Sequence, residues 1–167
     1  MDDGYSPQGF GRSGPVLAFA FLAIAAAATI FFLTEQTPAE TSFESDFVNE
    51  LLVGLFGWVP GVYDPQTGLW LGIGIRHWAH AAEFWLLGVF VALSAYFALR
   101  PRLLAAGVAS VAICAACSLF DQCHKLFVPG RHWDGFDLAM DALGYGVAVL
   151  TVLVVAWIAT AVGRDAS

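Results

Sequence analysis

The chain has 167 residues, of which 59% are apolar and 13% are charged, and its formal net charge is −7. A soluble domain is typically about 45–50% apolar and about 25% charged, so this composition argues against a soluble fold and favours a membrane protein. The acidic balance also argues against nucleic acid as a partner, because binding to phosphates needs a basic face.

Four apolar segments are long enough to cross a bilayer, which takes about 20 mostly apolar residues. We predict membrane-spanning helices at about 14–34, 76–99, 103–121 and 136–162. The first apolar run is longer than the core of a signal peptide and lacks a strongly basic flank, so we interpret it as an uncleaved helix. The predicted fold is an all-α integral membrane protein with a single domain over residues 1–167.

The basic residues give a weak signal for orientation. Four of them flank one side of a four-pass layout and three flank the other: Arg12, Arg100, Arg102 and Arg164 against Arg76, Lys125 and Arg131. Basic residues favour the cytoplasmic side, and residues 35–64 hold six acids and no base. We therefore expect a cell-membrane protein with both termini in the cytoplasm and the longer loops, 34–77 and 121–137, outside.

The first outer loop contains apolar residues at helical spacing from Phe43 to Phe56. This pattern predicts a short amphipathic helix along the outer membrane surface, with Thr41 and Glu44 as its capping box. Surface helices that bind anionic lipid usually carry basic residues. Because Asp46 and Glu50 make this polar face acidic, we expect the helix to cover the bundle instead.

Polar side chains gather where three of the predicted spans meet the outer side. Residues three or four apart share a helical face, which groups Arg76 with His80 and Glu83, and Asp137 with Asp141. The stretch after the third span adds four more: Asp121, His124, Lys125 and Arg131. Alternating passes put all of these at one membrane level. The cost of facing lipid would turn Glu83 and Asp141 inward, so the sequence predicts a shared outer pocket.

Three kinds of chemistry fit such a pocket. Arg76, Lys125 and Arg131 could bind a phosphate head group, with His80 or His124 as general base or nucleophile oriented by a carboxylate. The same residues could instead bind a metal, as inward Glu and His pairs do in some helical bundles. The residues proposed for these two roles are His80, Glu83, Asp121, His124, Asp137 and Asp141. In the third interpretation, which the sequence favours, acids and bases neutralise one another and lock the helix ends together.

These residues and their spacing resemble the VanZ-like membrane proteins, a family named after a protein associated with teicoplanin resistance. Its pattern at the second helix is matched by Arg76, Ala79, His80 and Glu83. The pattern after the third helix is matched by Asp121, His124, Phe127, Pro129, Gly130 and Arg131, and a later one by Asp137, Asp141 and Gly144. Gln122 and Lys125 depart from the typical Glu and Gln; the first change weakens a metal site and the second favours an anionic ligand.

The resemblance implies a place at the outer face of a bacterial cell membrane and a link to glycopeptide susceptibility, without a secure reaction. The expected function is to bind or process an anionic lipid head group or a lipid-linked cell-wall precursor. The alternative is a non-catalytic envelope protein, alone or as a subunit of a larger membrane complex, in which the charged cluster is only a lock. The sequence indicates no particular cofactor or oligomeric state.

Overall fold

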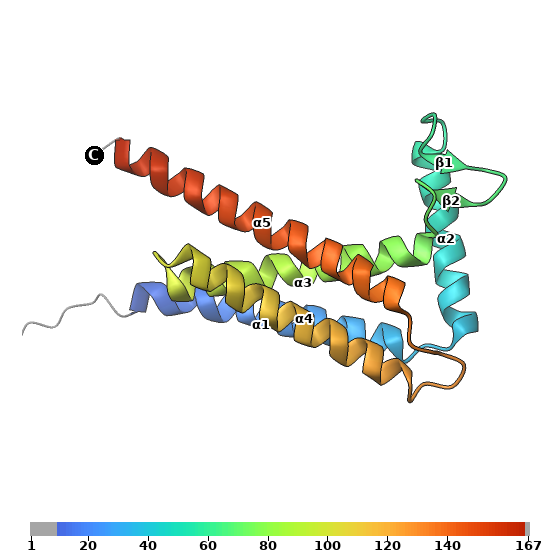
Figure 1. The fold of residues 1–167 in the computed structure, drawn as a ribbon, viewed down its shortest axis with the longest axis horizontal. Helices are drawn as coiled ribbons and strands as arrows, with labels where there is room; N and C mark the ends of the chain where they lie inside the picture. Colours follow the sequence, from blue (N-terminus) through green and yellow to red (C-terminus); the bar gives the residue numbers. More distant parts are fainter. Residues whose placement is uncertain (1–9, 166–167) are drawn as a thin grey trace, which may run out of the picture.

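The structure is a computed structural model that describes the backbone of residues 10–165 and the side chains of 13–37, 40–43 and 45–162. Four long helices run side by side: α1 (Phe10–Thr34), α3 (Ile75–Leu99), α4 (Leu103–Lys125) and α5 (Gly135–Asp165). A fifth helix, α2 (Pro38–Phe56), crosses one end of this bundle at a steep angle (Figure 1). The side chains of Arg12, Glu44 and Arg164, used in the sequence predictions, lie outside the described residues.

The segment between α2 and α3 adds a small hairpin that the sequence did not predict. Its strands, β1 (Tyr63–Asp64) and β2 (Leu69–Trp70), pair antiparallel with Tyr63 opposite Trp70. The indole of Trp70 donates to Asn49 Oδ1 of α2 at 2.7 Å. The hairpin is therefore attached to the crossing helix.

The four long helices have the length and composition of membrane spans: Ser13–Thr34, Ile75–Leu99, Leu103–Lys125 and Gly135–Val162. Large apolar side chains cover their outer surfaces, as at Phe21 and Leu104, which are 70% and 81% exposed. Such a surface suits lipid, and helices meet the demand that every backbone group in the bilayer be hydrogen-bonded internally. The prediction of an all-α integral membrane protein with four spans is confirmed.

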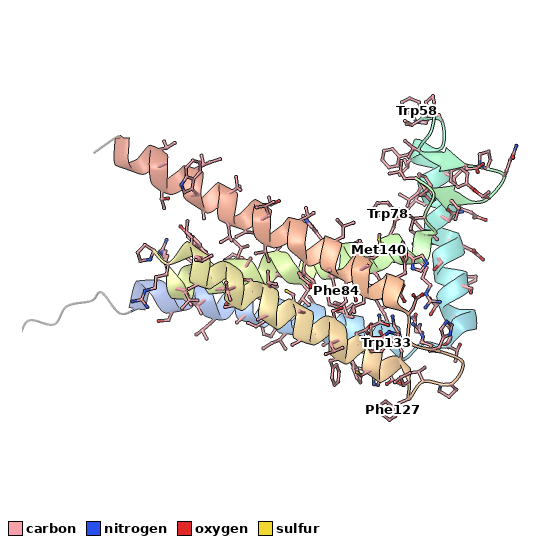
Figure 2. The ribbon with its side chains drawn as sticks, viewed as in Figure 1. Trp58, Trp78, Phe84, Phe127, Trp133 and Met140 are labelled. Carbon is pink, nitrogen blue, oxygen red and sulfur yellow. The ribbon has the colours of Figure 1, made fainter. Side chains whose placement is uncertain are left out.

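Helix α3 packs at the centre of the bundle, where Phe84 (labelled in Figure 2) and Leu87 are buried. It approaches α5 closely because two glycines lie in the contact. A Cβ atom on Gly144 would lie 2.1 Å from Ala81 O, and one on Gly88 would lie 2.9 Å from Ala148 Cβ. Small residues let backbones come together in membranes, so this contact sets how near α3 and α5 can bring their polar side chains.

Helix α2 begins earlier than predicted. The capping box consists of Thr37 and Glu40, whose carboxylate accepts from Thr37 N at 2.8 Å; the expected Thr41–Glu44 box is wrong. The physical reason is that Pro38 suits the first helical turn. These hydrogen bonds from Thr37 lower the pKa of Glu40. Because the helix starts early, Thr41 lies inside it and turns its side chain toward the bundle.

The third span ends later than predicted, at Lys125 instead of 121. The additional turn is helical and carries Gln122, His124 and Lys125. Helical spacing puts Lys125 on the same face as Asp121, four residues earlier. The extension therefore carries the lysine into the bundle.

Replacing Gly144 with alanine should separate α3 from α5, because the new Cβ would meet the Ala81 carbonyl and the backbone nitrogen of Trp85. Overpacking of this kind costs about 1–3 kcal/mol, which we expect to see as a lower thermal midpoint of the detergent-solubilised protein. The matched control is Gly146→Ala, since a Cβ on Gly146 meets nothing within 4 Å. Equal midpoints for the two variants would contradict this account of the contact.

Candidate functional site

The polar ends of α3, α4 and α5 meet beneath α2, at one end of the bundle (Figure 1). Five of the predicted site residues are buried together there: His80, Asp121, Lys125, Asp137 and Asp141. We call these five residues the buried cluster. The sequence predicted one shared site, and these five of its residues lie together at one end of the bundle.

Lys125 lies at the centre of the buried cluster and is fully buried. Its Nζ donates to Asp137 Oδ2 at 2.9 Å and lies 3.4 Å from Asp121 Oδ2 and 3.2 Å from His80 Nε2. A buried ammonium without partners would cost several kcal/mol. The lysine thus joins α4 to α5 through an ion pair and contacts α3 through the His80 ring.

His80 uses both ring nitrogens inside the buried cluster. Nδ1 lies 3.1 Å from Asp141 Oδ1, and Nε2 lies 3.3 Å from Asp137 Oδ2. One nitrogen faces a carboxylate on each side, so the ring is held in a single orientation.

Two hydroxyl groups that sequence reasoning missed complete the buried cluster. Ser118 donates to Asp141 Oδ2 at 2.7 Å, and Thr34 donates to Asp121 Oδ1. Both hydroxyls are buried. Their signal in the sequence is an isolated hydroxyl in an apolar segment, at the membrane level of the charged residues.

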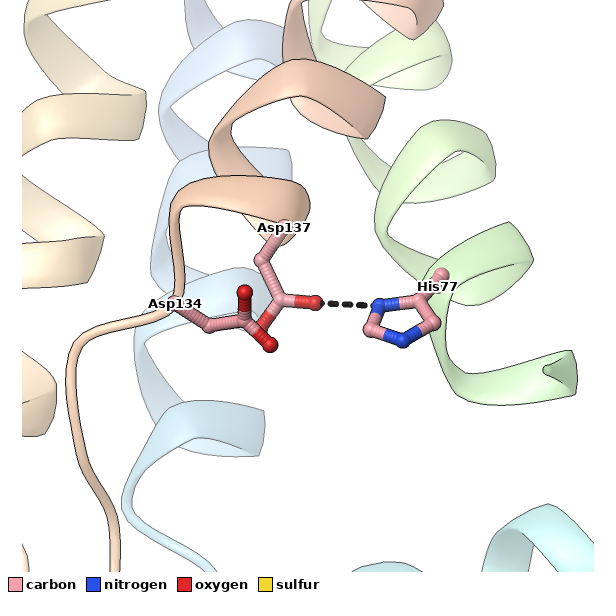
Figure 3. Close-up of side chains that lie close together, drawn as sticks. All are labelled: His77, Asp134 and Asp137. Carbon is pink, nitrogen blue, oxygen red and sulfur yellow. Dashed lines mark hydrogen bonds and ion pairs between the residues drawn. The ribbon is translucent and has the colours of Figure 1, made fainter. Parts of the chain in front are cut away.

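Asp137 also contacts two residues at the start of α3 that lie outside the buried cluster. Figure 3 shows His77 from α3 reaching Asp137 at the start of α5, with Asp134 beside them. His77 Nδ1 lies 2.8 Å from Asp137 Oδ1, and Arg76 Nη2 lies 3.6 Å from Asp137 Oδ2. His77 was not among the site residues predicted from the sequence.

A cavity of about 410 Å³ lies beside the buried cluster, between α1, α2 and α3. Its charged or titratable lining residues are Arg76, His80, Glu83 and Arg131. Apolar side chains from all three helices form much of the remaining wall, among them Leu33, Val48, Leu52, Ile75 and Trp78. Arg131 and His80 therefore border the same space, as the shared-pocket prediction requires.

Arg131 forms part of the cavity wall and holds the surrounding elements together. Nε donates to Gln36 O at 2.9 Å, and Nη2 donates to Leu33 O at 3.2 Å and to Thr41 Oγ1 at 2.6 Å. Nη1 donates to none of the described residues. Burial, and then the charge of Arg76, lowers the pKa of Arg131, although a guanidinium stays charged at neutral pH.

Arg76 and Glu83 have fewer hydrogen bonds and ion pairs than the other charged residues that line the cavity. The Arg76 side chain is 44% exposed and has one long ion pair, with Asp137. Glu83 is half-buried, and it forms no hydrogen bond or ion pair with the residues that the structure describes. An unpaired carboxylate within a span costs free energy, so binding a ligand or a proton at this position would be favourable.

His124 lies apart from the cavity. Its Nε2 is 2.5 Å from Glu35 Oε1, and its ring stacks on Phe31 with centroids 4.5 Å apart. Asp121 has separate partners in Thr34 and Lys125. Asp121 and His124, which were both predicted for the shared pocket, thus point into different surroundings.

The departures from the family pattern are both buried. Gln122 is fully buried and its Oε1 accepts from Asp134 N at 3.3 Å, which ties the loop before α5 to α4. Lys125 belongs to the buried cluster, as described above.

Replacing Lys125 with methionine should leave Asp121 and Asp137 without their shared cation. Removing one partner from a buried ion pair costs about 3–5 kcal/mol, which a denaturant or thermal unfolding titration can measure. Arg102→Met is the matched control, because Arg102 is exposed at the far end of the bundle, and a change within about 0.5 kcal/mol is expected there. A similar, small loss in both variants would show that Lys125 does not hold the helices.

Comparison with known proteins gives one match. The family model described as VanZ/LLP1 matches residues 19–157, a range that contains the buried cluster, the cavity and α2. No curated protein and no solved structure matches the chain. Because the match covers most of the sequence, the chain belongs to the VanZ/LLP1 family.

Proposed function

We propose that the cavity binds the anionic head group of a membrane lipid or of a lipid-linked cell-wall precursor. The observation that carries this proposal is that two guanidinium groups, from Arg76 and Arg131, border one cavity that is also lined by apolar side chains of three helices. The cavity lies at the end of the spans, where a lipid head group lies. Its mixed lining suits a ligand with a charged head and an apolar chain.

The two arginines differ in how many of their guanidinium donors are free to bind a ligand. Arg76 is half-exposed and holds only a distant carboxylate, so it is the main proposed contact for the anion. Arg131 is fixed by three hydrogen bonds and has Nη1 to offer. A guanidinium group can bind a phosphate through two parallel hydrogen bonds. Because Arg131 is already held in place, it would orient the ligand. Lys125 is buried among acids, so we assign it to the cluster and not to the ligand.

If the bound head group is also processed, Glu83 is our candidate for proton transfer. It lines the cavity and no described residue bonds to it, whereas both His80 nitrogens face carboxylates. General acid–base catalysis needs a group within hydrogen-bond reach of the reacting atom. His80, Asp121, Asp137 and Asp141 then act as positioning residues behind the cavity wall, and His124 supports the junction of α1 and α4.

A structural lock is the second candidate, and the pairing inside the buried cluster favours it. Lys125, His80, Asp137 and Asp141 all have partners within the cluster. The lock accounts for these residues but leaves Arg76 and Glu83 unexplained. We therefore propose a lock that supports a binding site, with the lock inside and the ligand in the cavity.

The consequence that we propose for the cell follows from the location. A protein of the cell membrane with both termini in the cytoplasm would open this cavity to the outer leaflet. Holding a wall precursor there would change how glycopeptides of the teicoplanin type reach it.

Replacing Arg76 with alanine should weaken binding of an anionic lipid about tenfold, because a hydrogen bond to a charged group contributes about 1.5–3 kcal/mol. Native mass spectrometry of the purified protein can compare phosphatidic acid and a polyprenyl phosphate with phosphatidylcholine. Arg102→Ala removes an exposed arginine at the opposite end and should bind like the wild type. Equal binding of charged and zwitterionic lipids by the unmodified protein would contradict the proposal.

Replacing Glu83 with glutamine keeps the shape of the side chain and removes its ability to transfer a proton. We expect lipid binding and thermal stability to persist, while any effect on teicoplanin susceptibility in an expressing bacterial host disappears. The Arg102→Ala variant again serves as the expression-matched control. An unchanged susceptibility effect in Glu83→Gln would rule out a chemical role for this residue and leave binding alone.

A further inference from the structure

The buried cluster carries more negative than positive charge. Asp121, Asp137 and Asp141 are 4%, 0% and 0% exposed, and Lys125 is the one lysine or arginine in the cluster. With a neutral His80 the cluster has two negative charges in excess. Arg76 is too distant and too exposed to balance them fully, at 3.6 Å from Asp137 with 44% of its side chain exposed. Uncompensated charge in such a setting is strongly unfavourable.

We propose that His80, Asp121 and Asp141 bind one divalent cation. The ion would neutralise Asp121 and Asp141, while Lys125 neutralises Asp137 at 2.9 Å. A metal-binding histidine is neutral, so the charges of the cluster then sum to zero without further protons. This site is separate from the proposed anion contacts and does not depend on them.

The geometry fits three ligands around one ion. Each of the three residues offers one ligand atom, and these atoms lie within 4.8 Å of one another. The 3.1 Å between His80 Nδ1 and Asp141 Oδ1 is close to the separation of two neighbouring ligands that each lie about 2.0–2.2 Å from a metal. Asp121 Oδ2 is buried and accepts no hydrogen bond; its charged neighbour is Lys125 Nζ, at 3.4 Å.

The groups behind these ligands have the arrangement found around metal sites. Metal-bound histidines usually donate their second nitrogen to a carboxylate, and bound carboxylates are themselves hydrogen-bonded. Here His80 Nε2 lies 3.3 Å from Asp137 Oδ2, and Lys125 Nζ lies 3.2 Å from the same nitrogen. Ser118 holds Asp141 Oδ2, and Thr34 holds Asp121 Oδ1. The other oxygen of each carboxylate is left for the ion.

The ligand types narrow the choice of metal. One imidazole and two carboxylates, with no thiolate, suit Zn²⁺ or Mn²⁺ better than a soft ion. His80 borders the cavity as well as the cluster, which gives the ion a route of entry. Lys125 Nζ lies 3.4 Å from Asp121 Oδ2, beyond the usual hydrogen-bond length, so this oxygen remains available.

A second group of possible ligands provides an internal control. His77, Asp134 and Asp137 also bring ligand atoms within 4.8 Å (Figure 3). Asp137, however, already faces Lys125, His80, His77 and Arg76. A cation there would have to displace existing positive partners, so we assign no ion to this group.

The test uses the purified chain in detergent, stripped with chelator and dialysed against Zn²⁺ or Mn²⁺. We expect about one ion per chain by elemental analysis and a higher thermal midpoint with metal. Asp141→Asn should bind at least about tenfold more weakly, and Ser118→Ala about 10–100-fold more weakly, as for other outer-shell changes. Asp134→Asn should match the wild type.

Two results would overturn the proposal: no saturable ion on the wild type, or a loss in Asp134→Asn equal to that in Asp141→Asn. Ser118→Ala removes only a hydroxyl, so it keeps the test decisive if Asp141→Asn does not fold; normal affinity in Ser118→Ala would also count against the site. Arg76→Ala should keep its metal while losing anionic lipid. The metal proposal and the lipid proposal can therefore fail separately.

Discussion

The ammonium of Lys125 lies fully buried within a bundle of membrane spans, and the rest of the structure depends on how it is paired. A charge at this depth needs anions at hydrogen-bond distance. Asp121 supplies one from its own helix and Asp137 supplies another from α5. His80 joins from α3. Three spans are thereby fixed at one level by one side chain.

The charged residues that line the cavity are different from those that pair with one another in the buried cluster. Arg76, Glu83 and Arg131 border the space beneath α2, and only Arg131 is strongly engaged, by the end of α1 and by Thr41. The residues of the buried cluster hold the helices together, and the charged residues of the cavity wall face any ligand that enters the cavity. This separation is why we propose anion binding for the cavity and a cation for the buried cluster. The two sites meet at His80, which borders both.

Much of this could be predicted from patterns. Four apolar runs predicted the spans, and the family resemblance is confirmed by the match over residues 19–157. Spacing of three and four residues put Asp137 and Asp141 on one helical face, and the alternation of passes placed His80 at the same end of the bundle. The α2 capping box was misplaced by four residues because both Thr37–Glu40 and Thr41–Glu44 fit the rule. The short hairpin was missed because its strands have two residues each.

By itself the sequence determined that the chain is a membrane protein, that it has four spans and that the polar residues gather at one end of the bundle. Hydropathy and the alternation of passes, from which these predictions come, depend only on composition and residue order. Only the tertiary structure decided which charges are paired and which remain free. Lys125 turned inward to Asp137 while Arg76 stayed half-exposed, and His124 turned away to Glu35. Those choices depend on how each helix is rotated within the bundle, which spacing along one helix does not specify.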